Sequence, residues 1–340
     1  MRVFLAEYVC SGGFCGTPVE QIEDSLRTEG AAMASALCED LAKVADVVFP
    51  VDARLRPCLP ACEEHPIHAG ESLYGQWAKA AAGCDAAIII APEKDGILAK
   101  AVGMLRAADV DVIAGTGDFL RVASDKLQTA RALHAAGVPH PATLMPNDPR
   151  SLERLRQGGQ VIVKPRDGCG TEAIRLFDDV DEAIRFAEET DLIQAFIPGL
   201  AASVAMIVDG SEMVVLPAVS QDISLATCAY LGGSGPLGND HQRRAASLAQ
   251  CAIAAMPPHA RGFVGLDLVL ADEGGEDCVI EINPRLTTSY VGLRKMVSGN
   301  LAARLLGLQC GPVQCKVGPD EVRWSREGKV WIEGVEVGHE

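Results

Sequence analysis

Residues 265–271, GLDLVLA, are followed by DEGGE at 272–276 and by DCVIEINPR at 277–285. The outer two segments are rich in apolar and β-branched residues, whereas the middle one is acidic and contains two glycines. This pattern predicts two antiparallel strands joined by a turn. Three polar residues interrupt the apolar strands, namely Asp267, Glu281 and Asn283.

The three polar residues predict a metal site. If the hairpin is symmetric about Gly274, Asp267 lies opposite Glu281, and Asn283 shares the face of Glu281. Two facing carboxylates repel each other unless a positive group lies between them. Mg²⁺ binds carboxylate and amide oxygens and leaves positions open for phosphate oxygens. The alternative is a solvent-facing polar side of an edge hairpin.

The composition excludes some classes of partner. The 340-residue chain is 48% hydrophobic and has a formal net charge of −16. Its length indicates two or three domains with a sizeable core. Sequence-independent binding to nucleic acid or to anionic membranes needs a basic surface, so we expect neither partner.

The N-terminal sequence and the cysteines bear on the cellular location of the protein. The apolar run in residues 1–8 is too short for a signal peptide, and no later stretch approaches a membrane span, so we expect a cytoplasmic protein. The 12 cysteines include no Cys-x-x-Cys, which favours reduced thiols. Only Cys58, Cys62, His65 and His68 resemble a cluster of metal ligands, and their spacing matches no structural zinc pattern well.

The first third of the chain alternates between two kinds of element. Apolar runs predict strands at 2–9, 47–51, 86–91 and 110–114, and helical spacing predicts helices at 26–44 and 96–107. We expect the intervening segment 54–74 to be irregular, because it contains three prolines and no clear period. Alternating strands and helices predict an α/β domain with a parallel sheet.

Two lysines follow in places that suit an anion. Ser124 can cap a helix over 125–136, whose first turn contains Lys126, although the helix dipole there favours anions. Lys164 ends an apolar strand, where an unpaired charge is costly, and precedes the loop Gly168-Cys169-Gly170. We therefore predict that Lys126 shares its site with a phosphate, with an ordinary exposed lysine as the alternative. We predict that the loop after Lys164 belongs to a hairpin that covers phosphates, with a plain β-turn as the alternative. The segment 230–236, YLGGSGP, predicts a mobile loop that closes over substrates.

The order of these motifs resembles the ATP-grasp superfamily of carboxylate–amine ligases. The resemblance covers about residues 90–300. It rests on Ser-Asp-Lys at a helix start, a strand ending in Lys-Pro before a glycine loop, Leu-Ile-Gln-x-Phe-Ile-Pro-Gly, Gly-x-Asp and Glu-Ile-Asn-Pro-Arg. It implies an N-terminal α/β domain over 1–115, a small α+β subdomain over 116–195, and a C-terminal α+β subdomain with the metal site over 196–340.

The resemblance also implies roles for individual residues. Lys126 and Lys164 would hold the ATP phosphates, the loop 168–170 would cover the terminal phosphate, and Arg285 would steady the transferred phosphoryl group. The strand Gln194-Ala195-Phe196-Ile197 would contact adenine through its backbone, and Asp267, Glu281 and Asn283 would hold one or two Mg²⁺ or Mn²⁺ ions. The chain departs from the family at Ala195, where Glu is frequent, and has no carboxylate between Gly199 and Ser203 to bind the ribose.

Further motifs resemble the tyramine–glutamate ligase group of methanofuran-type cofactor biosynthesis. They are Glu7-Tyr8-Val9 with Ser11-Gly12-Gly13, Glu29-Gly30-x-x-Met33, Ala91-Pro92-Glu93 and Thr287-Thr288-Ser289-Tyr290. The group joins the γ-carboxylate of glutamate to an aromatic amine through an acyl phosphate, and a relative could use tyrosine. The expected partners are therefore a small carboxylate and an amine; the oligomeric state, a homodimer included, stays open.

Candidate substrate contacts are Thr287, Thr288, Ser289, Tyr290 and Arg294, with helix capping as the alternative for the hydroxyl residues. Two other functions compete with the ligase. One is another ATP-grasp enzyme, such as an amino-acid or peptide ligase, a carboxylase or a kinase. The other is a non-catalytic nucleotide-binding protein, which is disfavoured because Lys164 and the metal residues are present.

Overall fold

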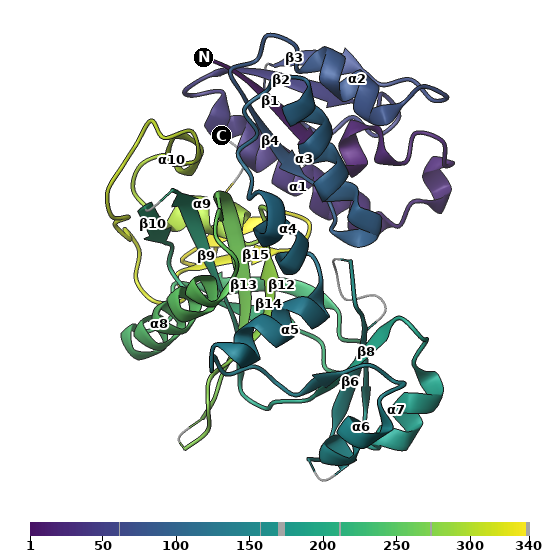
Figure 1. Ribbon diagram of the computed structural model, residues 1–340. Coiled ribbons are helices and arrows are strands. Elements are labelled where there is room, and N and C mark those ends of the chain that lie inside the picture. The colour runs from purple at the N-terminus through teal and green to yellow at the C-terminus, as the bar shows by residue number, and fades with distance from the viewer. Residues whose placement is uncertain (61, 157, 169–173, 211, 273, 338–340) are drawn as a thin grey trace.

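Three β-sheets organise the chain (Figure 1). The structure, a computed structural model, describes residues 1–337 except 61, 157, 169–173, 211 and 273. The strands of the three sheets come in turn from residues 1–115, 116–195 and 196–340. We retain these ranges as proposed domain boundaries.

The N-terminal sheet is parallel, with strand order β3-β2-β1-β4. Its elements are β1 (Arg2–Glu7), α1 (Asp24–Leu41), β2 (Asp46–Val51), β3 (Glu63–Pro66), α2 (Leu73–Ala80), β4 (Ala86–Ile90) and α3 (Ile97–Ala107). Alternate residues of β1 face opposite sides, so that Val3 packs in the core with α1 and Phe4 packs in the core with α2 and α3. The α/β prediction is confirmed.

Two details of this domain differ from the sequence prediction. The segment 54–74 is not wholly irregular, because it contains β3 and the start of α2. The strand expected at 110–114 is reduced to one parallel bridge between Ala87 and Val112. The apolar run there is buried by packing rather than by a full strand ladder, since Val110, Val112 and Ala114 belong to the core on the α3 side.

The large sheet is antiparallel and contains the predicted hairpin. Its strands are β9 (Leu200–Asp209), β10 (Glu212–Val215), β11 (Val219–Ile223), β12 (Tyr230–Gly235), β13 (Gly262–Leu270), β14 (Cys278–Asn283), β15 (Val322–Ser325), β16 (Val330–Ile332) and β17 (Val335–Val337). β13 and β14 pair with Asp267 opposite Glu281, and a bulge follows at Leu268. The register predicted from symmetry about Gly274 is therefore confirmed.

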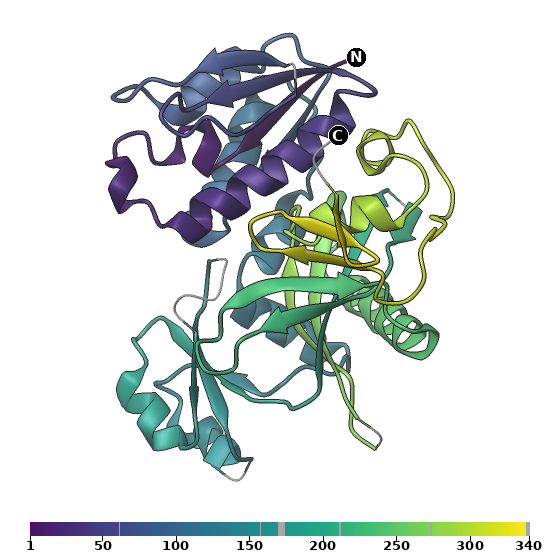
Figure 2. The same ribbon diagram turned by 180° about the vertical axis from the view of Figure 1, so that it is seen from behind.

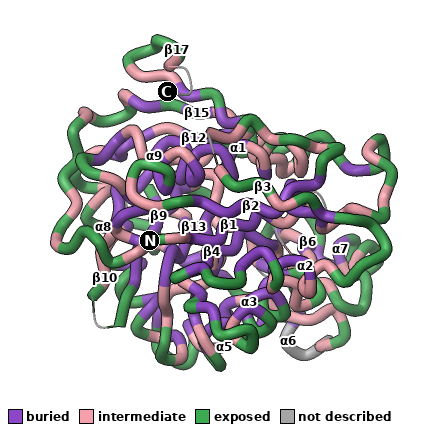
Figure 3. Tube along the Cα trace, turned by 90° about the horizontal axis from the view of Figure 1, so that it is seen from above, coloured by how far each residue is buried: buried purple, intermediate pink, exposed green. Residues whose placement is uncertain are grey.

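Helices cover the faces and ends of this sheet. They are α4 (Gly117–Ala123), α5 (Lys126–Ala135), α8 (Asn239–Ala255), α9 (Tyr290–Met296) and α10 (Leu301–Leu305). One core joins α1 of the N-terminal domain to α9, α10 and β15. The C-terminal strands, yellow in Figure 2, lie beside the N-terminal domain, and Gly328 in the β15–β16 turn lies against Ala32 of α1. Seen from above, buried residues follow β1, β2, β9 and β13 (Figure 3).

The small sheet has strand order β5-β8-β6-β7 and is antiparallel. Its elements are β5 (Thr143–Leu144), α6 (Pro149–Arg156), β6 (Val161–Pro165), β7 (Arg175–Phe177), α7 (Val180–Phe186) and β8 (Asp191–Ala195). β6 and β7 pair directly, so that the glycine-containing segment between them joins two antiparallel strands, as the sequence predicted.

The segment 230–236 is not the mobile loop that its glycines suggested. It forms β12, which pairs with β11 on one side and β15 on the other. Gly232 has φ +146°, and a Cβ there would lie 2.1 Å from the carbonyl oxygen of Trp324. Glycine is needed here for close packing of backbones rather than for movement. The prediction that 232–235 moves as a lid is therefore wrong.

Candidate active site

Two carboxylates face each other on the β13–β14 hairpin. Asp267 Oδ1 accepts a hydrogen bond from Gln221 Nε2 at 2.9 Å, and Asp267 Oδ2 accepts one from Asn283 Nδ2 at 3.1 Å. Burial raises the pKa of Asp267 to about 6, and the charge of Glu281 adds to that rise. Burial and the facing carboxylate thus outweigh the hydrogen bonds from Asn283 and Gln221 and the attraction to Arg285, all of which lower the pKa of Asp267.

Lys164 and Lys126 bring positive charge to the same place from two other elements. Lys164 at the end of β6 is 3% exposed, and burial lowers its pKa to about 8, while Glu281 and Asp267 oppose that effect. Lys126, the first residue of α5, has its Nζ 3.4 Å from Glu281 Oε1 and donates to the Gly168 carbonyl at 2.7 Å. The structure thus brings the predicted phosphate lysines next to the predicted metal residues.

The donor set fits a hard divalent cation. Two carboxylates and one amide side chain contribute oxygens, with no thiolate or imidazole among the predicted ligands. Asn283 is 5% exposed, and its amide nitrogen already donates to Asp267, which leaves its oxygen as the atom available to a cation. The repulsion that raises the pKa of Asp267 would be relieved by an ion between the carboxylates.

Asp125, and not Ser124, caps α5. Its carboxylate accepts from the backbone N–H groups of Leu127 and Gln128 and also pairs with Arg166 at 2.6 Å. The expectation for Ser124 is wrong because an ionised acceptor that also binds Arg166 is a stronger cap than a hydroxyl. This pair fixes the loop after β6 to the start of α5.

The phosphate loop is only partly described. Gly168 has φ +111°, a conformation that favours glycine, whereas Cys169 and Gly170 lie outside the described residues. The backbone N–H of Asp95, in the N-terminal domain, donates to Asp167 Oδ2 at 3.0 Å. The loop is therefore tied to the N-terminal domain as well as to α5.

Arg285 is the second residue after the end of β14 and lies close to the site. Its Nε lies 2.9 Å from Oε1 of Glu93, which follows β4, and both side chains are nearly buried. Glu7 at the end of β1 is also buried and accepts from the Cys10 N–H at 2.8 Å; burial raises its pKa, and attraction to Arg285 lowers it. The carboxyl ends of two parallel strands thus face Arg285, the usual place for ligands in such sheets.

The segment predicted to contact adenine, residues 194–197, already makes several hydrogen bonds within the protein. Gln194 is buried and donates from Nε2 to Thr143 Oγ1 at 2.7 Å. The backbone N–H groups of Ala195 and Phe196 donate to Ala142 and Gln160. Among the described residues, the N–H of Ile197 has no such partner, which makes it the available backbone donor in this segment.

The predicted substrate contacts divide into two groups. Thr287 Oγ1 and Ser289 Oγ hydrogen-bond each other at 2.9 Å, and Thr287 packs on Gly265 of β13, close to Asp267. Thr288 is half-buried beside them. These three stay candidates.

Tyr290 and Arg294 bind partners inside the protein. Tyr290 is fully buried and donates its hydroxyl to Asp40 Oδ2 at 2.8 Å, and Arg294 pairs with both Asp40 and Glu39. Assigning them to the substrate site was wrong, because Asp40 and Glu39 of α1 engage both polar groups and the Tyr290 ring packs against Phe263 inside the core.

The cysteine and histidine cluster does not form a metal site. No group of three or more potential His, Cys, Asp or Glu ligands occurs in the part of the chain that the structure describes. His65 instead contacts Glu63 in β3, and the carbonyl of Cys58 accepts from Ser35.

Comparison with known families agrees with this geometry. Residues 123–289 match the model of an ATP-grasp domain, and residues 45–118 match that of a pre ATP-grasp 3 domain. The chain contains an ATP-grasp domain. Its fold is the ATP-grasp fold, preceded by a parallel α/β sheet.

Two curated relatives of the chain are named tyramine–L-glutamate ligase. That from Methanocaldococcus jannaschii is 28% identical over 210 residues, covering 62% of this chain and 58% of the relative. That from Methanocaldococcus fervens is 30% identical over 212 residues, covering 62% of each. The chain therefore spans less than two thirds of the length of either relative.

A solved ATP-grasp structure resembles nearly the whole chain. It comes from Archaeoglobus fulgidus, is described as an ATP-grasp superfamily protein, and has a TM-score of 0.72 at 26% identity. The match covers 93% of this chain and 90% of that one. Across the described residues of this ATP-grasp chain, no helix is both long and apolar enough to cross a membrane.

Sequence reasoning gave no role to two residues of this ATP-grasp site. Gln221 on β11 holds Asp267, but nothing in its local sequence distinguishes it from an exposed strand glutamine. Glu93 was noted only as part of Ala91-Pro92-Glu93. Its position after an apolar strand of a parallel sheet is the signal that could have found it.

Proposed function

We propose that the chain is an ADP-forming ligase that joins the γ-carboxylate of glutamate to tyramine or a closely related aromatic amine. The observation that carries the proposal is the convergence of Asp267, Glu281, Lys164 and Arg285 from different elements. The two relatives named tyramine–L-glutamate ligase support the choice of acid and amine.

The carboxylates and lysines would divide the work of binding ATP. Asp267, Glu281 and Asn283 would hold Mg²⁺ or Mn²⁺, which when bound neutralises charge on the phosphate oxygens. Lys126 and Lys164 would bind the phosphate oxygens. Because Lys164 is buried, its charge is poorly screened and acts strongly on a nearby anion. The N–H of Ile197 would donate to the adenine.

The acid is activated before the amine attacks. A carboxylate oxygen of glutamate forms a bond to the γ-phosphorus of ATP, and the bond to ADP breaks. The amine nitrogen then forms a bond to the acyl carbon, and inorganic phosphate leaves as the proton departs from nitrogen. Arg285 would stabilise the phosphoryl charge in both steps, while Glu93 holds its guanidinium in place.

Water must be excluded until the amine attacks, because water would hydrolyse the acyl phosphate. The contacts of Asp167 and Gly168, at the start of the loop between β6 and β7, support this role for the loop, since Lys126 donates to the Gly168 carbonyl and Asp167 accepts from the N–H of Asp95 in the N-terminal domain. We propose that this loop closes over the terminal phosphate.

The test is substrate-dependent ADP release. ADP should form only when ATP, Mg²⁺, glutamate and an amine are present together, with tyramine and tyrosine compared as amines. Asp267→Asn should lower kcat at least about 100-fold, the loss expected when a group that holds a catalytic metal is removed. The variant should still fold cooperatively, because the substitution keeps the size of the side chain and its oxygen can accept one of the two hydrogen bonds that Gln221 and Asn283 donate.

The matched control is Asp272→Asn, which changes an exposed carboxylate in the turn of the same hairpin and should leave kcat unchanged. Wild-type turnover in Asp267→Asn would remove the metal assignment. Release of ADP at the full rate without any acid would overturn the ligase proposal.

A further inference from the structure

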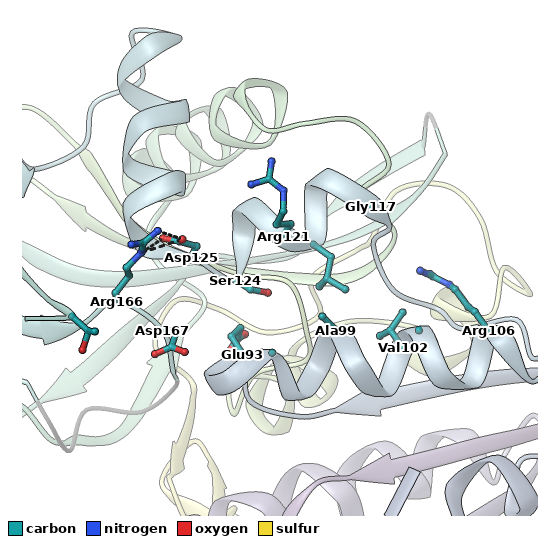
Figure 4. Close-up of a pocket in the computed structure, with 14 residues that line it drawn as sticks. Glu93, Ala99, Val102, Arg106, Gly117, Arg121, Ser124, Asp125, Arg166 and Asp167 are labelled. Atoms are coloured by element: carbon teal, nitrogen blue, oxygen red, sulfur yellow. Dashed lines mark hydrogen bonds and ion pairs between the residues drawn. The ribbon is translucent and has the colours of Figure 1, made fainter. Parts of the chain in front are cut away.

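A cavity of about 590 Å³ lies between the N-terminal domain and the start of the ATP-grasp domain (Figure 4). Helix α3 forms one wall and α4 the other, and the loop after β6 closes one end. The roles assigned above to the phosphate and metal residues do not use this space.

Small side chains on both helices keep the cavity open. Gly96 directly precedes α3, Ala99 and Gly103 follow at helical spacing on it, and Gly117 begins α4. A Cβ added at Gly103 or at Gly117 would meet nothing within 4 Å. The lining in the middle of the cavity is apolar, contributed by Ala99, Val102 and Leu120.

One end of the cavity is acidic and touches the active site. Glu93 lines the cavity and is 5% exposed. Its Oε1 lies 2.9 Å from Arg285 Nε, yet accepts no well-aligned hydrogen bond from any described residue. A carboxylate has room for about four donors, so Glu93 can bind Arg285 and a further cation together.

The far end offers no free anion site. Arg106 lies there, but its guanidinium donates to the carbonyls of Val112, Ala114 and Gly115. Arg166, at the acidic end, is paired with Asp125, and Arg121 on α4 is paired with Asp118. The cavity therefore suits a ligand with one cationic head and a mainly apolar body, rather than one with a carboxylate of its own.

We propose that this cavity binds the amine substrate, with its ammonium group at Glu93 and its apolar body between α3 and α4. The inference rests on the proposed ligase function and adds the position of the second substrate. Because Glu93 contacts Arg285, an amine held there lies beside the acyl phosphate that Arg285 stabilises.

Filling the cavity tests the inference. Gly103→Leu places a branched side chain on the α3 wall where a Cβ meets no neighbour, and leucine favours a helix over glycine, so the variant should fold. With tyramine as the probe, its KM should rise at least tenfold, while the KM values for ATP and glutamate stay within twofold. Met104→Leu, on the next and exposed position of α3, is the control and should match the wild type.

Hydroxylamine separates this inference from the ligase proposal. It is small, uncharged at neutral pH, and traps an acyl phosphate as a hydroxamate without needing the cavity. Gly103→Leu should form γ-glutamyl hydroxamate at the wild-type rate. Glu93→Gln should raise the KM for tyramine more than that for hydroxylamine, because only tyramine brings a charge to position 93.

The outcomes are distinct. An unchanged KM for tyramine in Gly103→Leu, with hydroxamate still formed, overturns the cavity assignment and leaves the ligase standing. Failure of the wild type to form hydroxamate with glutamate overturns the proposed function, and the cavity assignment with it.

Discussion

Lys164 is a cation that the fold buries in advance of its ligand. Its ammonium group has lost most of its water, and the neighbouring Asp267 and Glu281 compensate only partly, since the pKa of Lys164 is lowered to about 8. Burying charges that compensate one another adds little to the free energy of unfolding, but it holds the charges in fixed positions. The charges that would act on phosphate are therefore positioned before ATP arrives, which reduces reorganisation during the reaction.

His140 should make stability depend on pH. Burial, aided by the charge of Lys164, lowers its pKa to about 4, whereas the unfolded chain titrates near the ordinary value of 6.5. Between those values the unfolded state binds a proton that the folded state does not. Stability should therefore fall as the pH is lowered from about 6.5 toward 4, by up to about 1.4 kcal/mol per pH unit.

Urea unfolding at pH 7, 6 and 5 would measure this dependence. His140→Gln should lose less stability over that range than the wild type, and His134→Gln, at an exposed position of α5, should lose as much as the wild type. Parallel curves for the His140 variant and the wild type would contradict the assignment.

At the scale of elements, β12 shows how packing overrides local sequence. Gly232 must be glycine because a Cβ would lie 2.1 Å from the backbone oxygen of Trp324 and because φ is +146°. Gly232→Ala should destabilise the protein on the order of 2 kcal/mol or more. Gly16→Ala is the control, since a Cβ there meets nothing within 4 Å.

Thermal melts of the two variants would decide the point. If Gly232→Ala had the same melting temperature as the wild type, the segment would behave as the loop that its composition suggests rather than as a strand paired on both sides.

The contrast between two strand pairs explains what the sequence could predict. For β13–β14, alternation and turn composition were enough to place Asp267 opposite Glu281, because the partners lie 14 residues apart in one local unit. β12 pairs with β15, about 90 residues away, and no local sequence pattern predicts that pairing. The same limit applies to Tyr290, whose environment is set by Asp40, 250 positions earlier.

At the scale of the whole molecule, one buried ion cluster joins the first domain to the last third of the chain. Asp40 on α1 binds Arg294 and Tyr290 on α9, and its carbonyl accepts from Asn300 Nδ2. Asp40→Ala would leave the buried Arg294 with Glu39 alone and the buried Tyr290 hydroxyl without its acceptor, so we expect a loss of about 3 kcal/mol.

Chemical denaturation of Asp40→Ala beside Asp46→Ala, which changes an exposed carboxylate at the start of β2, would test this. The first variant should unfold at lower denaturant and the second should not. Equal midpoints would show that α1 and α9 are held together by their apolar core alone.

The hydrogen bond from the Asp95 N–H to Asp167 Oδ2 has a thermodynamic consequence. It connects Asp167, beside the proposed phosphate cover, to the turn before α3 that borders the proposed amine cavity. Linkage then requires reciprocity: whatever factor the amine contributes to nucleotide affinity, the nucleotide must contribute to amine affinity. Calorimetric titration of ADP with and without tyramine would give that coupling free energy, and a value of zero would show that the bond breaks before either ligand is held.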